Sequence, residues 1–169
     1  MKMPSRNLRL PDVLRIVTFA LLLGALSVAR AQIGPIEDLD AFPQASLEIA
    51  DGKTVKHTFQ VWLADSPARQ AQGLMFVRSL PDMHGMLFVH EKLVDASMWM
   101  KNTYIPLDMV FIDAKSRIQQ IIPNAKPHSL DIIRSKKPAL AVLELAGGDA
   151  ARLGLHPGQV VRHPALPQH

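Results

Sequence analysis

The sequence contains no cysteine, and only 5% of its residues are aromatic. Without cysteine the chain can form neither disulfide bonds nor thiolate metal sites, and it has no cysteine nucleophile. The fold must therefore be stabilised by a hydrophobic core alone. A domain of about 130 residues is large enough for this, since chains of that size bury well over half of the surface that they expose when unfolded.

Outside residues 1–31, the sequence also has no excess of positive or negative charge. Five of the 19 basic residues and one of the 15 acids lie in residues 1–31, so 14 of each remain and the formal net charge there is zero. A nucleic-acid-binding domain needs a basic patch of its own. The one basic cluster, Arg134 with Lys136 and Lys137, is interpreted as a solvated edge. We expect no nucleic acid as a partner.

No hydrophobic run is long enough for an ordinary membrane-spanning helix, which needs about 20 apolar residues. The longest uncharged apolar run, Ile16–Val28, has 13 residues. Basic residues precede it, and the small-x-small sequence Ala29-Arg30-Ala31 follows it. This pattern predicts a secretory signal peptide over residues 1–31 and a periplasmic or secreted mature protein without a stable membrane span. An uncleaved anchor is the alternative.

The common catalytic motifs are missing as well. The sequence has no G-x-S-x-G, no G-x-x-x-x-G-K-[ST] and no G-x-G-x-x-G, and its seven histidines show no H-x-x-x-H or H-x-H spacing. These motifs carry nucleophilic serines, phosphate-binding loops and zinc ligands. We therefore expect no cofactor and no metal site, and the sequence does not identify a catalytic residue.

Short apolar runs separated by turn residues predict a mainly β domain. Residues 46–50 and 55–64 alternate between apolar and polar side chains, and Asp51-Gly52 between them favours a hairpin. Further strands are predicted over 85–90, 96–100, 109–113, 117–122, 140–145 and 159–162. We expect an antiparallel β-sandwich or barrel-like domain with one or two short helices, after an N-terminal signal helix.

Two short helices are predicted, and the domain limits follow from composition. Ser66-Pro67 offers an N-cap and a proline at the first helical position, with Gly73 as the stop, and 147–154 is a second helical candidate. Residues 32–44 are acidic and contain two prolines, which is typical of a linker. We expect a single β-rich domain over 45–162 and a flexible, proline-rich tail over 163–169.

Several segments together resemble the domain of unknown function 192 family. They are RQAQGLMFVR (69–78), GMLFV (85–89), WMKNTYIPLD (99–108), VFID (110–113), LELAG (143–147) and GLHPG (154–158). The resemblance covers about residues 45–162 and implies a compact β-sandwich or barrel of a kind often exported from bacteria or archaea. It implies no agreed activity. One departure is His90, where the family often has a carboxylate or a glycine turn.

The segment Trp99–Asp108 is the best candidate for a binding site. Lys101 supplies a cation, Asn102 an amide and Asp108 an anion, while Trp99 forms an apolar wall. This mixture is typical of small-molecule pockets. The alternative is structural: Asn102 stabilises a turn, and Asp108 pairs with Lys101 or Arg78 to hold the sheet.

Arg78 and Glu144 complete the candidate ligand-binding residues. Glu144 lies within LAVLELAG, on the opposite face of the predicted strand from Leu143 and Leu145. If that face is buried, Glu144 needs a partner, and we expect Arg78 or Lys101 in that role. A surface-exposed Glu144 is the alternative, since glutamate is rarely buried.

Three functions remain open from the sequence. The first is a non-enzymatic module that binds a small polar or sugar-like ligand, or a partner protein such as an envelope protein. The second is an acid–base hydrolase or lyase that uses Asp108 or Glu144 with Lys101. The third is Cu(I) handling by methionines, for which Met98-x-Met100 and Met83-His84-x-Met86 supply thioethers. Core packing is the alternative role for these methionines.

Overall fold

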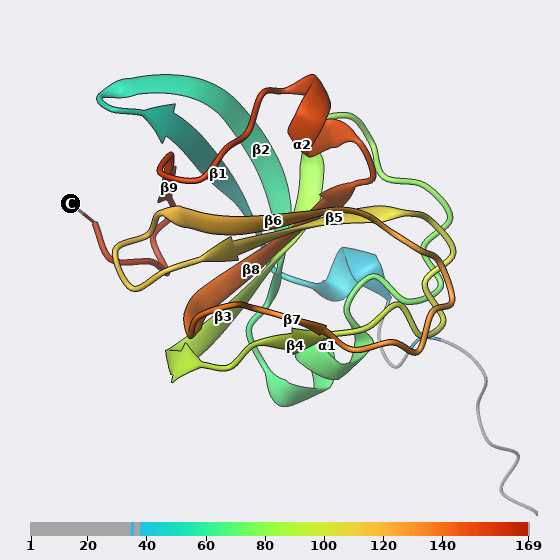
Figure 1. Ribbon diagram of the computed structural model, residues 1–169. Helices are drawn as coiled ribbons and strands as arrows, with labels where there is room; N and C mark the ends of the chain where they lie inside the picture. Colours follow the sequence, from blue (N-terminus) through green and yellow to red (C-terminus); the bar gives the residue numbers. More distant parts are fainter. Residues whose placement is uncertain (1–34, 36–37, 169) are drawn as a thin grey trace, which may run out of the picture. The chain divides into compact units, whose positions relative to one another are not determined.

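The computed structural model describes residues 35 and 38–168, so the predicted signal peptide lies outside the described residues. The described part is mainly β, as predicted (Figure 1). Its strands are β1 (Gln44–Asp51), β2 (Thr54–Ala64), β3 (His84–Val94), β4 (Ser97–Met98), β5 (Leu107–Ile112), β6 (Ile118–Ala125), β7 (Ile133–Arg134), β8 (Ala139–Ala146) and β9 (Val160–Arg162). The helical elements are the 3-10 turn η1 (Leu39–Ala41), α1 (Pro67–Gln72) and α2 (Asp149–Arg152).

The helix α1 begins and ends where its sequence signals predict. The Ser66 hydroxyl accepts a hydrogen bond from the Arg69 N–H at 3.3 Å, and Pro67 occupies the first turn. Gly73 ends the helix with a positive φ of 50°. Because α1 connects β2 to β3, these two strands run parallel, whereas all other pairings among the described strands are antiparallel. This parallel pair was not predicted.

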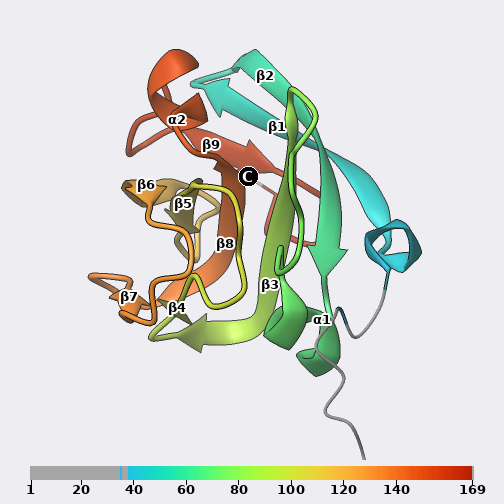
Figure 2. The ribbon, with the colours of Figure 1, turned by 90° about the vertical axis from the view of Figure 1, so that its right-hand side faces the viewer.

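The large sheet curls until its two ends meet. Its seven strands have the order β6-β5-β8-β3-β2-β1-β9. A bridge between Arg117 and Val160 then joins the β6 end to β9, and the Ile118 N–H donates to the Gln159 carbonyl at 2.9 Å. The sheet is thus a closed barrel (Figure 2), and its outermost strands pair with each other and leave no open ladder at this point.

The central strands are buried on both faces. Alternate residues of all seven strands fill the barrel interior, including Leu47, Phe59, Leu87, Leu143 and Val161. The intervening residues of β2, β3, β5 and β8 form a second apolar layer outside the barrel. That outer layer is covered by the segment 96–106 and by η1 and α1 with the residues that follow them. The covering residues include Phe42 after η1, Leu74 after α1, and Ala96 and Met100.

The structure differs from the sequence prediction at both ends of the domain. In the predicted linker, η1 precedes Phe42, whose side chain is buried in the outer layer. In the predicted flexible tail, Leu166 is buried in the barrel core, and the Ser116 hydroxyl donates to the Pro167 carbonyl at 2.7 Å. Apolar burial therefore fixes residues 38–44 and 163–168, although the proline content of these parts of the chain is typical of unstructured segments.

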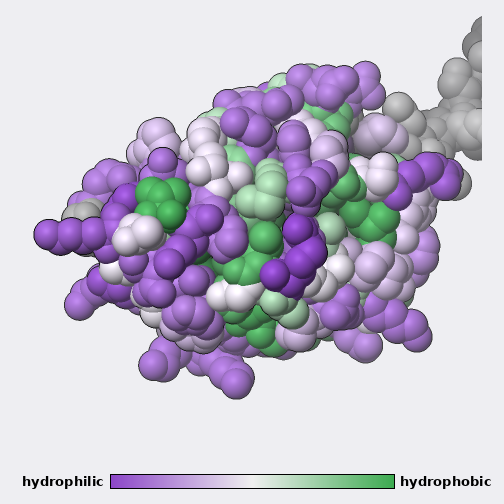
Figure 3. Space-filling model, turned by 90° about the horizontal axis from the view of Figure 1, so that it is seen from above, coloured by the Kyte–Doolittle hydropathy of each residue, from purple (hydrophilic) through white to green (hydrophobic). Residues whose placement is uncertain are grey.

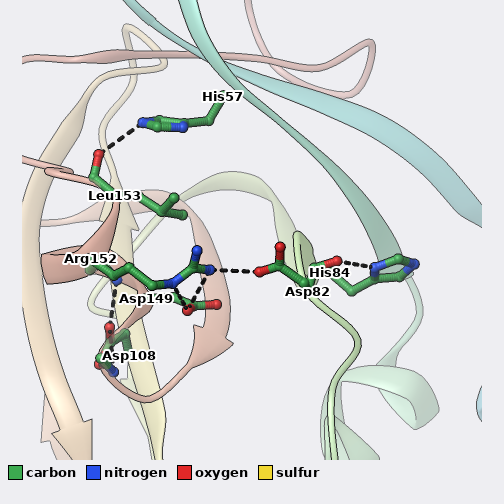
Figure 4. Close-up of polar contacts among 9 residues, drawn as sticks. His57, Asp82, His84, Asp108, Asp149, Arg152 and Leu153 are labelled. Carbon is green, nitrogen blue, oxygen red and sulfur yellow. Dashed lines mark hydrogen bonds and ion pairs between the residues drawn. The ribbon is translucent and has the colours of Figure 1, made fainter.

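The end of the domain that carries α2 is mainly hydrophilic at its surface (Figure 3). Here Arg152 lies between Asp149 and Asp82, at 2.8 Å and 2.7 Å, and ties α2 to the segment before β3 (Figure 4). The His57 ring contacts the Leu153 carbonyl at 2.8 Å. These surface interactions contribute little stability individually, but they fix α2 above the barrel. No helix among the described residues is long and apolar enough to cross a bilayer.

The tight packing between β3 and β8 gives a stability prediction. A Cβ at Gly85 would lie 2.5 Å from the Glu144 carbonyl oxygen, which belongs to backbone that cannot move aside easily. We expect Gly85→Ala to lower the free energy of unfolding by about 1–3 kcal/mol in urea titrations. The control is Gly52→Asn in the β1–β2 turn, where no atom lies within 4 Å and asparagine tolerates the positive φ. Equal stability of the two variants would contradict the account.

Candidate functional site

Glu144 is an acidic residue placed inside the outer apolar layer. On β8, Leu143 and Leu145 point into the barrel, so Glu144 points outward with Val142, as its position in the strand predicts. Its register partners are Met86 on β3 and Met109 on β5, both fully buried. The Glu144 side chain is itself only 3% exposed. A single carboxyl therefore lies between two methionines.

The carboxyl of Glu144 is not neutralised by a cation. Its Oε2 atom has no hydrogen-bond partner among the described residues, and no ion pair there involves Glu144. Desolvation by burial raises the pKa of Glu144 from 4.5 to about 8. At pH 7 the group is consequently a neutral carboxylic acid, which both donates and accepts hydrogen bonds. Strongly perturbed acids in pockets are candidates for functional groups.

A small pocket opens onto this carboxyl. Its volume is about 30 Å³, close to the share of one water molecule in the liquid. It lies between the end of α1 and the segment 98–103, and its walls include Gly73, Leu74, Met75, Phe88, Met98, Trp99 and Thr103. Trp99 is 44% exposed, so its ring both lines the pocket and faces solvent. One hydroxyl-sized group fits inside, while the rest of a ligand would lie outside against Trp99.

Cations stack on aromatic rings around this opening. The Lys101 Nζ lies 5.1 Å from the centre of the Trp99 ring, and the Arg78 guanidinium lies 5.1 Å from that of Tyr104. Neither cation pairs with Glu144, so the prediction that Arg78 or Lys101 neutralises it is wrong. Burial of the carboxyl is instead balanced by retention of its proton.

Asn102 holds the turn that carries these residues. It has a positive φ of 55°, a conformation that asparagine tolerates better than most residues. Its carbonyl accepts the Phe76 N–H at 2.8 Å, and its side-chain amide contacts the Met75 sulfur at 3.9 Å. These contacts fasten the segment 99–104 to the chain beyond α1. They agree with the structural alternative for Asn102.

Asp108 is a buried structural residue with no exposed surface. Its Oδ1 accepts the N–H groups of Asn124 at 2.8 Å and Gly148 at 3.0 Å. Its Oδ2 accepts those of Gly148 at 3.0 Å and Ala150 at 2.8 Å. The carboxylate thus fastens the start of α2 to β5 and β6. Main-chain donors occupy both oxygens, and the predicted pairing with Lys101 or Arg78 is absent from the described ion pairs.

The structure therefore brings together two of the six candidate residues, Trp99 and Glu144. Lys101 and Asn102 lie beside them without lining the pocket, Arg78 lies over Tyr104, and Asp108 is elsewhere. Because Asp108 has no exposed surface, it cannot share an open concavity with Lys101. The acid–base hypothesis that combines Asp108 with Lys101 therefore lacks the geometry that it requires.

The sequence did not identify the walls of the Glu144 pocket that α1 and Thr103 form. Residues 70–74 lie far from 144 in the sequence, and no local signal shows that α1 covers β8. Met86, Met100 and Met109 have no exposed surface and pack in the outer layer, whereas Met75 and Met98 line the pocket. Two thioethers and one carboxyl are fewer soft ligands than a complete copper site uses. The described residues contain no group of three or more histidine, aspartate or glutamate side chains that could hold a metal ion.

A larger groove, of about 530 Å³, lies elsewhere, between the ends of β2 and β3 and the C-terminal segment. It is open and lined mostly by apolar groups such as Leu63, Val89 and Leu140. Its Asp65 is already paired with Arg69 at 2.9 Å. His90 contributes an unpartnered Nε2, and desolvation lowers its pKa. We favour the smaller pocket as the site because it is lined by Glu144, whose carboxyl is buried and has an unpartnered oxygen.

The role of Asp108 can be tested by stability measurements. Asp108→Ala leaves three backbone N–H groups without their acceptor, and we expect a loss of about 3 kcal/mol or more in the free energy of unfolding. Asp113→Ala is the control, because its Oδ1 accepts two N–H groups at an exposed turn. The control should lose less than about 1 kcal/mol. Similar losses in urea denaturation would show that Asp108 is not specially important.

The raised pKa of Glu144 predicts how stability depends on pH. Between pH 4.5 and 8 the folded state keeps a proton that the unfolded state has lost, so stability falls as pH rises through this window. The slope contributed by one such group is at most about 1.4 kcal/mol per pH unit. Glu144→Gln should remove this slope and be more stable than the native chain at pH 9, as measured by urea unfolding from pH 4 to 9. Parallel pH profiles would contradict the assignment.

The chain has relatives in sequence and in structure. The model of DUF192, described as "Uncharacterized ACR, COG1430", matches residues 47–163. A solved structure from Sinorhizobium meliloti 1021, described as a proposed transcription regulator, is 40% identical with a TM-score of 0.71, covering 74% of this chain and 97% of that one. A protein of unknown function from Novosphingobium aromaticivorans DSM 12444 is 37% identical with a TM-score of 0.71, covering 75% and 90%. None of the curated proteins compared with the chain matches it. With its matching segments, its barrel and these relatives, the chain belongs to the DUF192 family.

Proposed function

We propose that this domain is a non-enzymatic binding module for a small polar, sugar-like ligand, which places one hydroxyl in the Glu144 pocket. The observation that carries the proposal is the buried, unpartnered Glu144 carboxyl beneath a pocket that reaches solvent beside Trp99. A buried polar group without a partner is costly, so a ligand that satisfies it gains binding energy there. The predicted periplasmic or secreted location is part of this proposal.

The chemistry of the pocket favours a hydroxyl over an ammonium group. A neutral carboxyl offers one donor and free acceptor capacity, and a hydroxyl offers the same combination in return. An ammonium group offers donors alone, so it would have to displace the proton of Glu144 or leave it without an acceptor. The half-exposed Trp99 ring adds a flat apolar surface on which the carbon face of a sugar can pack.

Catalysis is less well supported than binding. Acid–base chemistry on a bound substrate needs a second group that takes or gives a proton near the first. In the described pocket, Glu144 is accompanied by the Thr103 hydroxyl and by the side-chain amides of Gln70 and Gln72, and by no second acid, histidine or lysine. A role in transcription, which the description of the Sinorhizobium relative names, would require a basic nucleic-acid-binding site, and the Glu144 pocket contains no basic residue.

Binding can be measured by NMR titration of the protein with glucose, galactose, mannose and N-acetylglucosamine. We expect at least one sugar to shift the Trp99 indole and Gly73 amide signals. Glu144→Leu should abolish this binding, because it removes both the donor and the acceptor. Glu144→Gln should retain part of it, since an amide keeps both functions. In the native protein, binding should weaken as pH rises above 8 and Glu144 loses its proton.

The matched control is Leu93→Ala, an exposed apolar residue on β3 that does not line the pocket. It should bind as the native protein does. If no sugar shifts these signals, or if Glu144→Leu binds with unchanged affinity, the pocket is not the site that we propose.

A further inference from the structure

Exposed apolar side chains gather on two neighbouring loops. Of the six large hydrophobic residues that are most exposed among the described ones, four belong to the segments 95–104 and 126–137, with exposures of 37–67%. These four are Trp99, Tyr104, Leu130 and Ile132. The remaining two are Val55 on β2 and Leu93 on β3, the second of which lies two residues before the segment 95–104. Scattered single residues need no explanation, but a group on one edge marks an interaction surface.

Hydrogen bonds show that the two loops lie side by side. The Met100 N–H donates to the Ser129 carbonyl at 3.1 Å, and Met98 pairs with Ile133 in the β4–β7 ladder. Trp99 therefore lies opposite the stretch that carries Leu130 and Ile132. The Tyr104 ring packs on that of His128, with 5.3 Å between centroids. We call these two segments the β4–β7 edge; β4 and β7 lie at the same end of the domain as α1 (Figures 1 and 2).

The β4–β7 edge is also basic. Its exposed charged residues are the bases Lys101, Lys126, Arg134, Lys136 and Lys137 and the acids Asp95 and Asp131. None of the ion pairs among the described residues involves any of them. Because residues 32–169 have no net charge, this local excess means that the rest of the domain is acidic. From the sequence, the basic cluster was interpreted as a solvated edge only. In the structure, this cluster borders the apolar group.

We propose that the β4–β7 edge docks on an anionic phospholipid surface. Tryptophan and tyrosine favour the boundary between headgroups and acyl chains, because one part of each ring system is apolar and another can hydrogen-bond. Leucine and isoleucine at a loop tip enter the same boundary, and lysines beside them attract anionic headgroups. A nucleic acid would use the bases but not Leu130 and Ile132, since such interfaces are polar. Membrane binding of this kind is peripheral. The proposal does not depend on whether the pocket binds a sugar.

The test uses the full chain with vesicles of phosphatidylglycerol and phosphatidylcholine at 1:1, and with phosphatidylcholine alone. Trp62 is buried, so a change in tryptophan emission reports on Trp99. We expect a blue shift with the anionic vesicles, and its loss in Trp99→Phe. This readout is local, so binding through the apolar run of residues 16–28 does not imitate it.

Paired variants separate the apolar and electrostatic contributions. Leu130→Ser/Ile132→Ser and Lys136→Glu/Lys137→Glu should each weaken vesicle binding about tenfold or more. Their controls are Val55→Ser, which removes an exposed apolar group of β2, and Lys53→Glu/Lys56→Glu in the β1–β2 hairpin region. The controls should bind within about twofold of the native chain, and 0.5 M NaCl should weaken native binding.

Four results would overturn the proposal. The first is unchanged Trp99 emission on vesicles that do bind the chain. The second is equal binding of the β4–β7 edge variants and their controls. In the third, sedimentation shows an oligomer that Leu130→Ser/Ile132→Ser dissociates, which would assign the surface to a second copy of the chain. In the fourth, a duplex DNA binds the chain, loses affinity in Lys136→Glu/Lys137→Glu and keeps it in Leu130→Ser/Ile132→Ser.

Discussion

The burial of one ionisable carboxyl in an apolar layer is the constraint on which the proposed site depends. Glu144 is only 3% exposed, and none of the ion pairs of the described residues involves it. The protein therefore stabilises it as a neutral acid, at a cost in stability that increases above pH 4.5. A hydrophobic residue of similar size at this position would carry no such cost. The ligand that we propose would offset this cost by giving the carboxyl a hydrogen-bond partner.

The closed barrel explains why the domain has an apolar layer outside the sheet. Strands β3, β5 and β8 are apolar on both faces, so closing the sheet buries one face and leaves the other in need of a cover. The helix α1 and the segment 96–106 provide that cover, and the pocket lies where they meet. The segment 96–106 also forms part of the β4–β7 edge. Trp99 thus belongs both to the wall of the pocket and to the exposed apolar group, so the proposed ligand site lies next to the proposed docking surface.

The sequence predicted much of the fold because local signals agreed with the tertiary structure. Ser66, Pro67 and Gly73 marked α1 within one residue, and the alternation around Asp51-Gly52 marked the first hairpin. The period of β8 also placed Glu144 on the correct face. In contrast, the buried Phe42 and Leu166 lie in proline-containing segments, where composition indicates loose chain. Their positions depend on contacts with distant strands that no local pattern encodes.

The candidate site was predicted only in part for the same reason. Lys101 and Asp108 lie seven positions apart across a turn, and the sequence predicted that their charges pair. Main-chain N–H groups of Asn124, Gly148 and Ala150 satisfy Asp108 instead, and those residues come from elements distant in sequence. A buried carboxylate that accepts several N–H groups needs no cation. The partner of an acid is therefore not predictable from charge alone when backbone donors compete.

The most direct test of the account is the pKa of Glu144 itself. The protein can be labelled with ¹³C at glutamate side-chain carboxyls, and the carboxyl signal of Glu144, assigned by its loss in Glu144→Gln, can be followed from pH 3 to pH 10. The account predicts a transition near pH 8 for this signal. A transition near pH 4.5 would mean that the carboxyl is hydrated or paired, and the neutral acid at the base of the pocket would not exist.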